Sequence, residues 1–253
     1  MELAGLHAFV TGGGRGIGEA VSRSLVVSGA VVTIVGRTEA SLRNVVDAGG
    51  ASAWMLLDVT DDRAIARCVA AAAAERGPIE ILVNNAGAVE TAAFGRIDRG
   101  LWDRMLAANL TSVFLMSQAV LPGMLARRRG RIVNIASTAG LTGYPYVAAY
   151  VAAKHGVVGL TRALALEVAT SGITVNAVCP GYTETELLRE SMQNIVRKTG
   201  RSEADVRASI IRNNPQARLV RPDEVAAAVN FLCGPGSDAM TGQAIAVAGG
   251  EIM

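Results

Sequence analysis

The chain has few cysteines, few histidines and almost no lysine. Its three cysteines, Cys68, Cys179 and Cys233, are too far apart in the sequence to indicate a disulfide framework or a cluster of metal ligands. The two histidines, His7 and His155, have no cysteine or second histidine close to them in the sequence. We therefore expect no metal site, and we expect the cysteines to be buried apolar residues.

Net charge and long apolar runs are also limited. The formal net charge of +2 is too small to indicate binding to nucleic acid. Although 51% of the residues are hydrophobic, we expect charged residues to interrupt each apolar run before it could span a bilayer. The first residues, MELAGLHAFVTG, lack the basic region and cleavable apolar segment of a signal peptide. These features predict a cytoplasmic protein with no membrane or nucleic-acid partner.

The sequence does contain a regular alternation of short apolar segments and helix-length segments. The apolar segments are AFVTG, VVTIVG, AWMLLD, IEILVNNAG, GRIVNIAS, ITVNAVCPG and AIAVAGG. They are hydrophobic throughout, which is typical of parallel strands buried on both faces. We expect helices at about 17–28, 39–48, 61–76, 101–128 and 150–170. We therefore predict that residues 1–253 form a single α/β domain. Its core would be a doubly wound, Rossmann-like parallel sheet with helices on both faces.

The segment at about 183–222 breaks this alternation. It is polar and charged, has only weak helical spacing, and lies between two strand-helix units. An insertion beyond the carboxyl end of a strand is placed to cover a bound ligand, so we predict a substrate lid. The alternative is a surface excursion with no part in binding.

A glycine motif, TGGGRGIG, follows the first apolar segment. Gly12, Gly16 and Gly18 stand where a helix is expected to begin. Glycines at such positions permit a tight turn and let the backbone approach a pyrophosphate at the positive end of the helix. The motif predicts a dinucleotide site, although a glycine-rich turn can also serve only to connect a strand to a helix.

The end of the second apolar segment indicates which dinucleotide binds. Folds that prefer NAD usually place an acidic residue there, on the ribose 2′-hydroxyl, but this strand ends in Gly36 and Arg37. Arg37, together with Arg15 of the glycine loop, could bind a 2′-phosphate through planar guanidinium donors. We therefore favour NADP(H), with NAD(H) possible. The alternative is that both arginines are solvated surface residues.

A tyrosine and a lysine stand four residues apart in the predicted helix at 150–170. At that spacing Tyr150 and Lys154 share one face of the helix. The chain has 22 arginines and only one other lysine, Lys198. A lysine at position 154 therefore suggests a specific need for an ammonium group.

Together these motifs resemble the classical short-chain dehydrogenase/reductase family. The matches are TGxxxGxG at residues 11–18, NNAG at 84–87, YxxxK at 150–154, and, in order with them, Asn109, Ser137 and the Pro180-Gly181 pair. The resemblance extends over essentially the whole chain. It implies a single-domain oxidoreductase, commonly a homotetramer.

The resemblance also implies a catalytic set, Asn109, Ser137, Tyr150 and Lys154. Tyr150 would protonate a carbonyl oxygen as hydride arrives, and because a phenol has an ordinary pKa near 10, it needs help to exchange protons near neutral pH. Lys154 would favour the phenolate and bind the nicotinamide ribose. Ser137 would donate a hydrogen bond to the substrate oxygen. Asn109 would take part in a water-mediated proton relay to Lys154.

Cofactor contacts are implied in the same way. Asp58 corresponds to a residue on the adenine side, or alternatively is the N-cap of the following helix. Thr183 and Thr185 correspond to the stretch that holds the nicotinamide carboxamide. The full expected set is Gly12, Arg15, Gly16, Ile17, Gly18, Arg37, Asp58, Val59, Asn85, Ala86, Gly87, Tyr150, Lys154, Pro180, Gly181, Thr183 and Thr185.

The substrate is indicated less directly. The stretches RLVRPDEVA and TGQAIAVAGG resemble reductases of 3-oxoacyl thioesters and related 3-hydroxyacyl dehydrogenases. Reductases that act on acyl carrier protein tend to have basic residues both near the Arg128 position and before the GITV strand. This chain has Thr170 and Ser171 before Gly172, which argues against a carrier-protein substrate and favours coenzyme A. The arginines within 187–219 could meet a coenzyme A phosphate or a free carboxylate, or could simply be solvated. The leading hypothesis is NADP(H)-dependent interconversion of a 3-oxoacyl and a 3-hydroxyacyl thioester.

Two alternatives remain open. The first is an NAD-dependent dehydrogenase of a small hydroxy acid such as 3-hydroxybutyrate, because family members of that kind also carry a long lid. The second is a cofactor-binding regulator that has lost catalysis, against which the intact catalytic set argues.

Overall fold

The computed structural model of the protein describes residues 2–252, apart from the side chain of Lys198. Within this range seven strands form one sheet in the order β3-β2-β1-β4-β5-β6-β7, and every neighbouring pair is parallel. The strands are β1 (His7–Thr11), β2 (Val31–Gly36), β3 (Ala53–Leu56), β4 (Ile79–Asn84), β5 (Gly130–Ile135), β6 (Ile173–Pro180) and β7 (Ala244–Val247). The predicted doubly wound sheet is confirmed.

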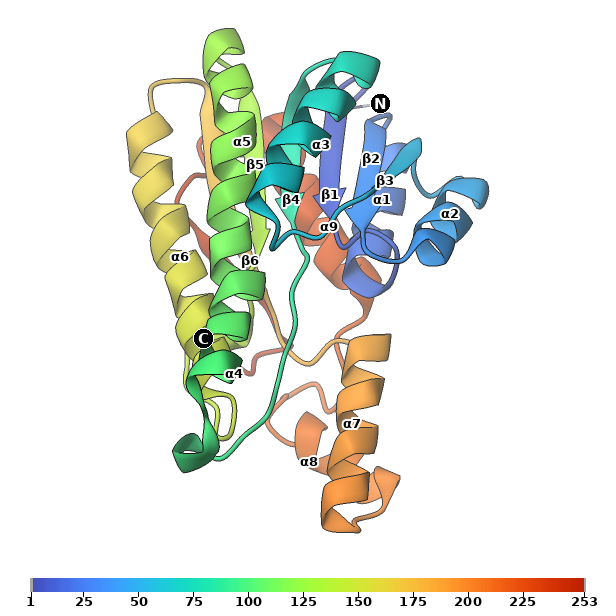
Figure 1. Ribbon diagram of the computed structural model, residues 1–253, viewed down its shortest axis with the longest axis vertical. Coiled ribbons are helices and arrows are strands. Elements are labelled where there is room, and N and C mark those ends of the chain that lie inside the picture. Colours follow the sequence, from blue (N-terminus) through green and yellow to red (C-terminus); the bar gives the residue numbers. More distant parts are fainter. Residues whose placement is uncertain (1, 253) are drawn as a thin grey trace.

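Helices cover both faces of the sheet (Figure 1). One apolar cluster joins α1, α2 and α9 to the sheet, and a second joins α3, α5 and α6 to the opposite face. These helices are α1 (Gly16–Val27), α2 (Glu39–Asp47), α3 (Asp62–Arg76), α5 (Ser112–Arg127), α6 (Ala148–Val168) and α9 (Pro222–Cys233). The arrangement follows from right-handed crossovers between parallel strands.

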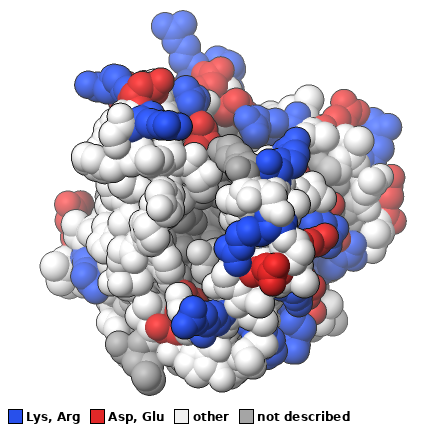
Figure 2. All heavy atoms as spheres, turned by 90° about the horizontal axis from the view of Figure 1, so that it is seen from below, with Lys and Arg blue, Asp and Glu red and all other residues white. Residues whose placement is uncertain are grey.

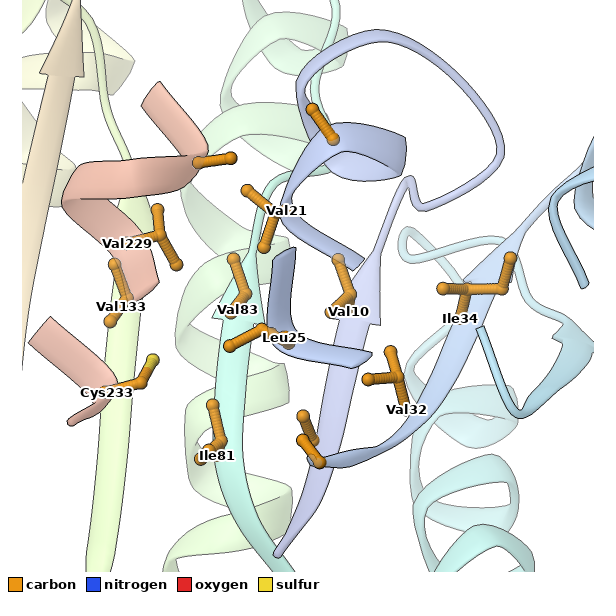
Figure 3. Close-up of a cluster of buried hydrophobic side chains, with 14 of the residues drawn as sticks. Val10, Val21, Leu25, Val32, Ile34, Ile81, Val83, Val133, Val229 and Cys233 are labelled. Carbon is orange, nitrogen blue, oxygen red and sulfur yellow. The ribbon is translucent and has the colours of Figure 1, made fainter. Parts of the chain in front are cut away.

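Successive strand residues point to opposite faces, so each apolar strand contributes to both clusters. On β1, Val10 belongs to the first cluster and Phe9 to the second, and both are fully buried. Figure 3 shows the first cluster, in which helix side chains meet strand side chains from four neighbouring strands. The labelled members are Val10, Val21, Leu25, Val32, Ile34, Ile81, Val83, Val133, Val229 and Cys233. The three cysteines of the chain are all buried, as expected.

The predicted lid is a pair of helices beyond the carboxyl ends of the strands. The two helices, α7 (Glu186–Thr199) and α8 (Glu203–Ile211), extend away from the sheet (Figure 1). They share a small apolar core of their own, with Met192, Val206, Ile210 and Leu219 buried in it. A bridge between Thr183 and Val220 closes the base of the pair. That this segment covers a bound substrate stays a prediction.

The expectation that charges interrupt every apolar run is wrong for one helix. Residues 105–126 carry no charged side chain, and the helical stretch Arg99–Arg127 is long and apolar enough to cross a membrane by length and composition alone. Here this stretch packs on the sheet, where Met116, Val120 and Met124 are buried against β4 and β5. The helix is apolar on that side because it covers the core.

Candidate active site

The glycine loop lies between β1 and α1 at the carboxyl edge of the sheet. Gly16 has a φ of +57°, and a Cβ at this position would lie 3.2 Å from Cγ2 of Thr185, at the start of α7. A Cβ on Gly18 would lie only 2.2 Å from the carbonyl oxygen of Gly12. The side chain of Arg15 at the N-cap makes no capping hydrogen bond with α1. The first N–H groups of the helix are therefore available to an anion.

The end of β4 is tied to the glycine loop by Thr11 and Asn85. The hydroxyl of Thr11 accepts hydrogen bonds from the backbone N–H groups of Asn85 at 2.9 Å and Ala86 at 3.0 Å. The side chain of Asn85 donates to the carbonyl oxygens of Thr11 and Gly12, at 2.9 and 3.1 Å. Sequence reasoning did not assign Thr11 this role, because its partner lies 74 residues away.

Asn109 is fully buried in a π-helical turn, Ala107–Thr111, rather than in the uninterrupted helix predicted for 101–128. This turn joins α4 (Arg99–Leu106) to α5. The Asn109 amide donates to the carbonyl oxygens of Ala88 at 2.8 Å and Met105 at 3.0 Å, and accepts from the N–H of Ala88 at 3.2 Å. The wider turn places this side chain against the segment that follows β4.

Ser137, Tyr150 and Lys154 meet beside the end of β5. Ser137 follows β5, and its side chain lies close enough to the phenol of Tyr150 to favour the ionised form. Lys154, one turn further along α6, donates from Nζ to the carbonyl oxygen of Ile135 at 2.8 Å, and Nζ lies 5.7 Å from the Tyr150 ring centroid. A Cβ on Gly87 would lie 2.6 Å from Oδ1 of Asn109 and 3.8 Å from Nζ of Lys154. The fold therefore gathers all four predicted catalytic residues around one point.

Burial has the largest effect on the pKa values of Tyr150 and Lys154. It raises the pKa of Tyr150, and the nearby Ser137 side chain offsets only part of that effect. Burial also lowers the pKa of Lys154 to about 8, because removing the ammonium from water disfavours its charged form. The structure thus differs from the sequence argument, in which the Lys154 charge lowers the pKa of the phenol. In this arrangement Tyr150 carries its proton at neutral pH.

The two arginines predicted to bind a 2′-phosphate, Arg15 and Arg37, are both exposed. In the described part of the chain they share no common ion-pair partner. The guanidinium of Arg15 pairs with Glu186 at 3.2 Å and Glu190 at 3.3 Å, both on α7. Arg37 follows β2 and lies close enough to Asp58 to contribute to lowering its carboxyl pKa, after the larger effect of hydrogen bonds from Thr60. The structure therefore connects Arg15 to α7.

The alternative role considered for Asp58, as a helix N-cap, is wrong. Asp58 accepts hydrogen bonds from the backbone N–H and hydroxyl of Thr60, at 2.9 and 2.7 Å. Asp61 is the residue that caps α3, through a 3.0 Å bond from the N–H of Ala64. Asp58 is thus left at the carboxyl edge of the sheet with an exposed side chain.

The remaining predicted cofactor residues line the same edge. Pro180 ends β6, and the hydroxyl of Thr183 donates to the carbonyl oxygen of Gly181 at 2.9 Å. Thr185 caps α7 by accepting from the N–H of Leu188 at 3.3 Å. Two residues of the set, Ile17 and Val59, are half-buried and pack against the two core clusters.

A cleft of about 240 Å³ separates the segment after β4 from the lid. Leu187, Glu190, Ser191 and Asn194 of α7 line it, at the spacing of one helix face. Val89, Glu90 and Thr91 line the other side. Figure 2 shows this end of the molecule, where a hollow is bordered on one side by a largely uncharged surface. Among the described lining residues none is one of the lid arginines.

A further cluster near Ser137 was not predicted. All four tyrosines of the chain fall between residues 144 and 182, and three of them, Tyr144, Tyr150 and Tyr182, gather here. The hydroxyl of Tyr144 donates to Oε1 of Glu251 at 2.5 Å. The concentration of tyrosines in a chain with 4% aromatic residues was the available signal.

Comparison with known proteins agrees with this geometry. Residues 6–195 match the model of the short chain dehydrogenases. The chain is 43% identical to the granaticin polyketide synthase putative ketoacyl reductase 1 of Streptomyces violaceoruber, over 96% of this chain and 92% of that protein. It is 38% identical to the 3-oxoacyl-[acyl-carrier-protein] reductase of Salmonella typhimurium, over the full length of both.

A solved structure is also similar. The fold superimposes on a crystal structure of a variant actinorhodin polyketide ketoreductase with NADPH, with a TM-score of 0.93 and 41% identity. The match covers 97% of each chain. The similarity therefore includes the lid as well as the sheet.

Proposed function

The chain belongs to the short chain dehydrogenase family, and we propose that it uses NADPH to reduce the 3-oxo group of an acyl thioester to a 3-hydroxy group. The observation that carries the proposal is the meeting of Ser137, Tyr150 and Lys154 at the carboxyl edge of the sheet, beside the glycine loop. Relatives named as ketoacyl reductases and 3-oxoacyl reductases support the choice of substrate.

The residues present fit a dinucleotide. The uncapped N-terminus of α1 offers backbone N–H groups to a pyrophosphate. Gly18 lies so close to the carbonyl oxygen of Gly12 that the turn between them has no room for a side chain at position 18. Asp58 would face the adenine, and Thr183 and Thr185 the carboxamide. Similarity to a ketoreductase crystallised with NADPH supports NADPH over NADH. When bound, the cofactor supplies hydride to the substrate carbonyl carbon.

The side chains supply and move the proton. Tyr150, whose phenol keeps its proton at neutral pH, donates that proton to the carbonyl oxygen as the oxygen gains charge. Ser137 donates a hydrogen bond to the same oxygen and fixes its distance from Tyr150. Lys154 and Asn109, which meet at Gly87, then return a proton to Tyr150 through water.

Coenzyme A is the proposed acyl carrier. Thr170 and Ser171 carry no charge of their own where related reductases are basic, so the basic surface that an acidic carrier protein would meet is reduced there to Arg128, which donates to the carbonyl oxygen of Thr170. The exposed arginines of α7 and α8 are available to a phosphate at the outer rim, although they do not line the cleft itself. A carrier-protein substrate is the competing possibility, in keeping with the name of the Salmonella relative.

The test is to follow NADPH oxidation with acetoacetyl-coenzyme A and with an acetoacetyl acyl carrier protein, and to identify the product by mass spectrometry. We expect a 3-hydroxybutyryl thioester, formed faster from the coenzyme A ester. Faster turnover of the carrier-protein ester would correct the carrier alone. No turnover of either thioester, alongside NAD-dependent oxidation of 3-hydroxybutyrate, would replace the proposal with the hydroxy-acid dehydrogenase.

We also propose a homotetramer in the cytoplasm. Large apolar side chains are exposed on the outer helices, including Phe114 and Leu125 on α5 and Leu166 on α6. Surfaces of this kind are commonly covered by another subunit. Sedimentation equilibrium would show a mass four times that of the chain, whereas a monomer would contradict the proposal.

A further inference from the structure

A carboxylate from the end of the chain reaches the substrate side of the candidate active site. Glu251 lies in the loop after β7 and is half-buried. Its Oε1 accepts the 2.5 Å hydrogen bond from Tyr144, whose hydroxyl also lies 2.9 Å from Oγ1 of Thr138. Because Thr138 directly follows Ser137, only two hydrogen-bonded side chains separate the carboxylate from the catalytic group.

The segment after β6 holds the carboxylate from its other side. A Cβ on Gly181 would lie 2.9 Å from Oε2 of Glu251, so this position accepts only glycine without displacing the carboxylate. The next residue, Tyr182, stands edge-on to Tyr144, with ring centroids 6.2 Å apart and an angle of 82° between the planes. Glu251 and the two tyrosines therefore form one wall beside Ser137 and Tyr150.

Among the residues that the structure describes, no cation forms an ion pair with this wall. Glu90 and Glu190, at the mouth of the cleft, pair with Arg104 and Arg15. Among the described ion pairs none includes Glu251. Lys154 is buried, and its Nζ bonds the carbonyl oxygen of Ile135.

An unpaired carboxylate in a partly desolvated site repels a second anion strongly, because the low dielectric weakens screening. A 3-oxo acid carries its carboxylate two bonds from the carbonyl carbon that is reduced. A thioester presents an uncharged group at the same place. The two substrate classes therefore differ by one negative charge near the wall.

Resting on the proposed function, we infer that Glu251, held by Tyr144, is a specificity-determining residue that excludes free 3-oxo carboxylates and admits 3-oxoacyl thioesters, whose thioester group is uncharged. The same feature separates this chain from a dehydrogenase of free hydroxy acids. Glu251 acts through its charge, and Tyr144 positions it.

The test compares acetoacetate with methyl acetoacetate, two 3-oxo substrates that differ in charge. The quantity measured is the ratio of kcat/KM for the anion to kcat/KM for the ester, with saturating NADPH, in wild type and Glu251→Gln. We expect the ratio to rise about tenfold or more in Glu251→Gln, mainly through KM for the anion. Added salt should raise the ratio in wild type and leave it nearly unchanged in the variant.

Two further variants separate the effect of the Glu251 charge from the effects of a structural change. Tyr144→Phe removes the hydrogen bond and keeps the carboxylate, so it should shift the ratio less than Glu251→Gln. Glu167→Gln makes the same charge change on the exposed side of α6 and should leave the ratio at the wild-type value. Equal losses with both substrates in Glu251→Gln would show a merely structural role and overturn the inference. The same holds if that variant still fails to reduce acetoacetate.

Reduction of methyl acetoacetate by the wild-type enzyme tests the proposed function separately from the inference on Glu251. If wild type reduces methyl acetoacetate with NADPH but the ratio does not respond to Glu251→Gln, the inference alone is wrong. If wild type reduces neither the ester nor a 3-oxoacyl thioester, both the proposed function and the inference fail.

Discussion

Nζ of Lys154 lies 5.7 Å from the ring centroid of Tyr150 while donating to the carbonyl oxygen of Ile135. One turn of α6 thus carries a phenol that faces the substrate side and an ammonium that is held against the end of β5. The pKa of the phenol is raised and that of the ammonium is lowered, both chiefly by burial. The phenol of Tyr150 therefore holds its proton, whereas the ammonium of Lys154 can lose a proton near pH 8.

Removing the phenol hydroxyl should abolish most of the activity without removing the cofactor. We expect Tyr150→Phe to lower kcat for thioester reduction by about 100- to 10,000-fold, the usual contribution of a positioned acid. The Kd for NADPH, measured by nicotinamide fluorescence, should stay close to the wild-type value. The matched control is Tyr146→Phe, which alters an exposed tyrosine and should leave kcat unchanged. A Tyr150→Phe enzyme of nearly normal kcat would remove Tyr150 from the mechanism.

The reaction should lose efficiency above about pH 8. Lys154 is charged below its pKa of about 8 and neutral above it, so its interaction with the cofactor ribose weakens as pH rises. The measurement is kcat/KM for NADPH against pH, because this parameter reports groups of the free enzyme. We expect Lys154→Arg, if active, to extend the plateau to higher pH, because a guanidinium keeps its charge. A profile that is level through pH 8 in wild type would contradict the assignment.

Arg37 should determine the preference for NADPH over NADH. A charge-assisted hydrogen bond to the 2′-phosphate contributes about 1.5–3 kcal/mol, so Arg37→Ala should weaken NADPH binding about 10- to 100-fold. NADH lacks that phosphate, and its Kd should hardly change. Arg67→Ala removes an exposed arginine from the middle of α3 and serves as the control. Equal binding of NADH and NADPH by wild type would show that Arg37 is only a solvated surface residue.

Asn109 should contribute to stability as well as to the site. Asn109→Ala leaves the half-buried N–H and carbonyl of Ala88 and the carbonyl of Met105 without their present partner. We expect a loss of about 1–3 kcal/mol in the free energy of unfolding, measured by urea denaturation. The exposed Asn44→Ala change on α2 should stay within about 0.5 kcal/mol of wild type. Equal stability of the two variants would mean that water replaces the Asn109 amide.

His7 should make the fold sensitive to acid. Its Nδ1 lies 2.8 Å from the carbonyl oxygen of Gly77 and its Nε2 lies 2.8 Å from Oγ1 of Thr33. Burial lowers the pKa of His7 below 6.5, so at acidic pH the unfolded chain binds a proton that the folded chain does not. Stability should therefore be complete above about pH 6.5 and fall as the pH drops towards the folded pKa. Chemical denaturation across this range should show a shallower pH dependence in His7→Gln, and identical slopes would contradict the role.

Local patterns in the chain were enough to predict the architecture. Continuous apolarity in β1, β2 and β4 reports burial on both faces of a strand, and the spacing of Tyr150 and Lys154 reports one helix face. The glycine loop was also predictable, because Gly12 and Gly16 have a positive φ and Gly18 lies against the backbone of Gly12, only six residues away. Each of these features depends on neighbours along the chain, so the sequence alone determines it.

Other features depend on contacts between distant residues, and only the folded chain determines them. The turn that buries Asn109 forms against Ala88, and the bond from Tyr144 to Glu251 joins residues 107 positions apart. Arg15 turns towards Glu186 and Glu190 because the start of α7 lies beside the glycine loop. The lowered pKa of Lys154 likewise reflects desolvation, which depends on the packing around a side chain and which no spacing of residues expresses.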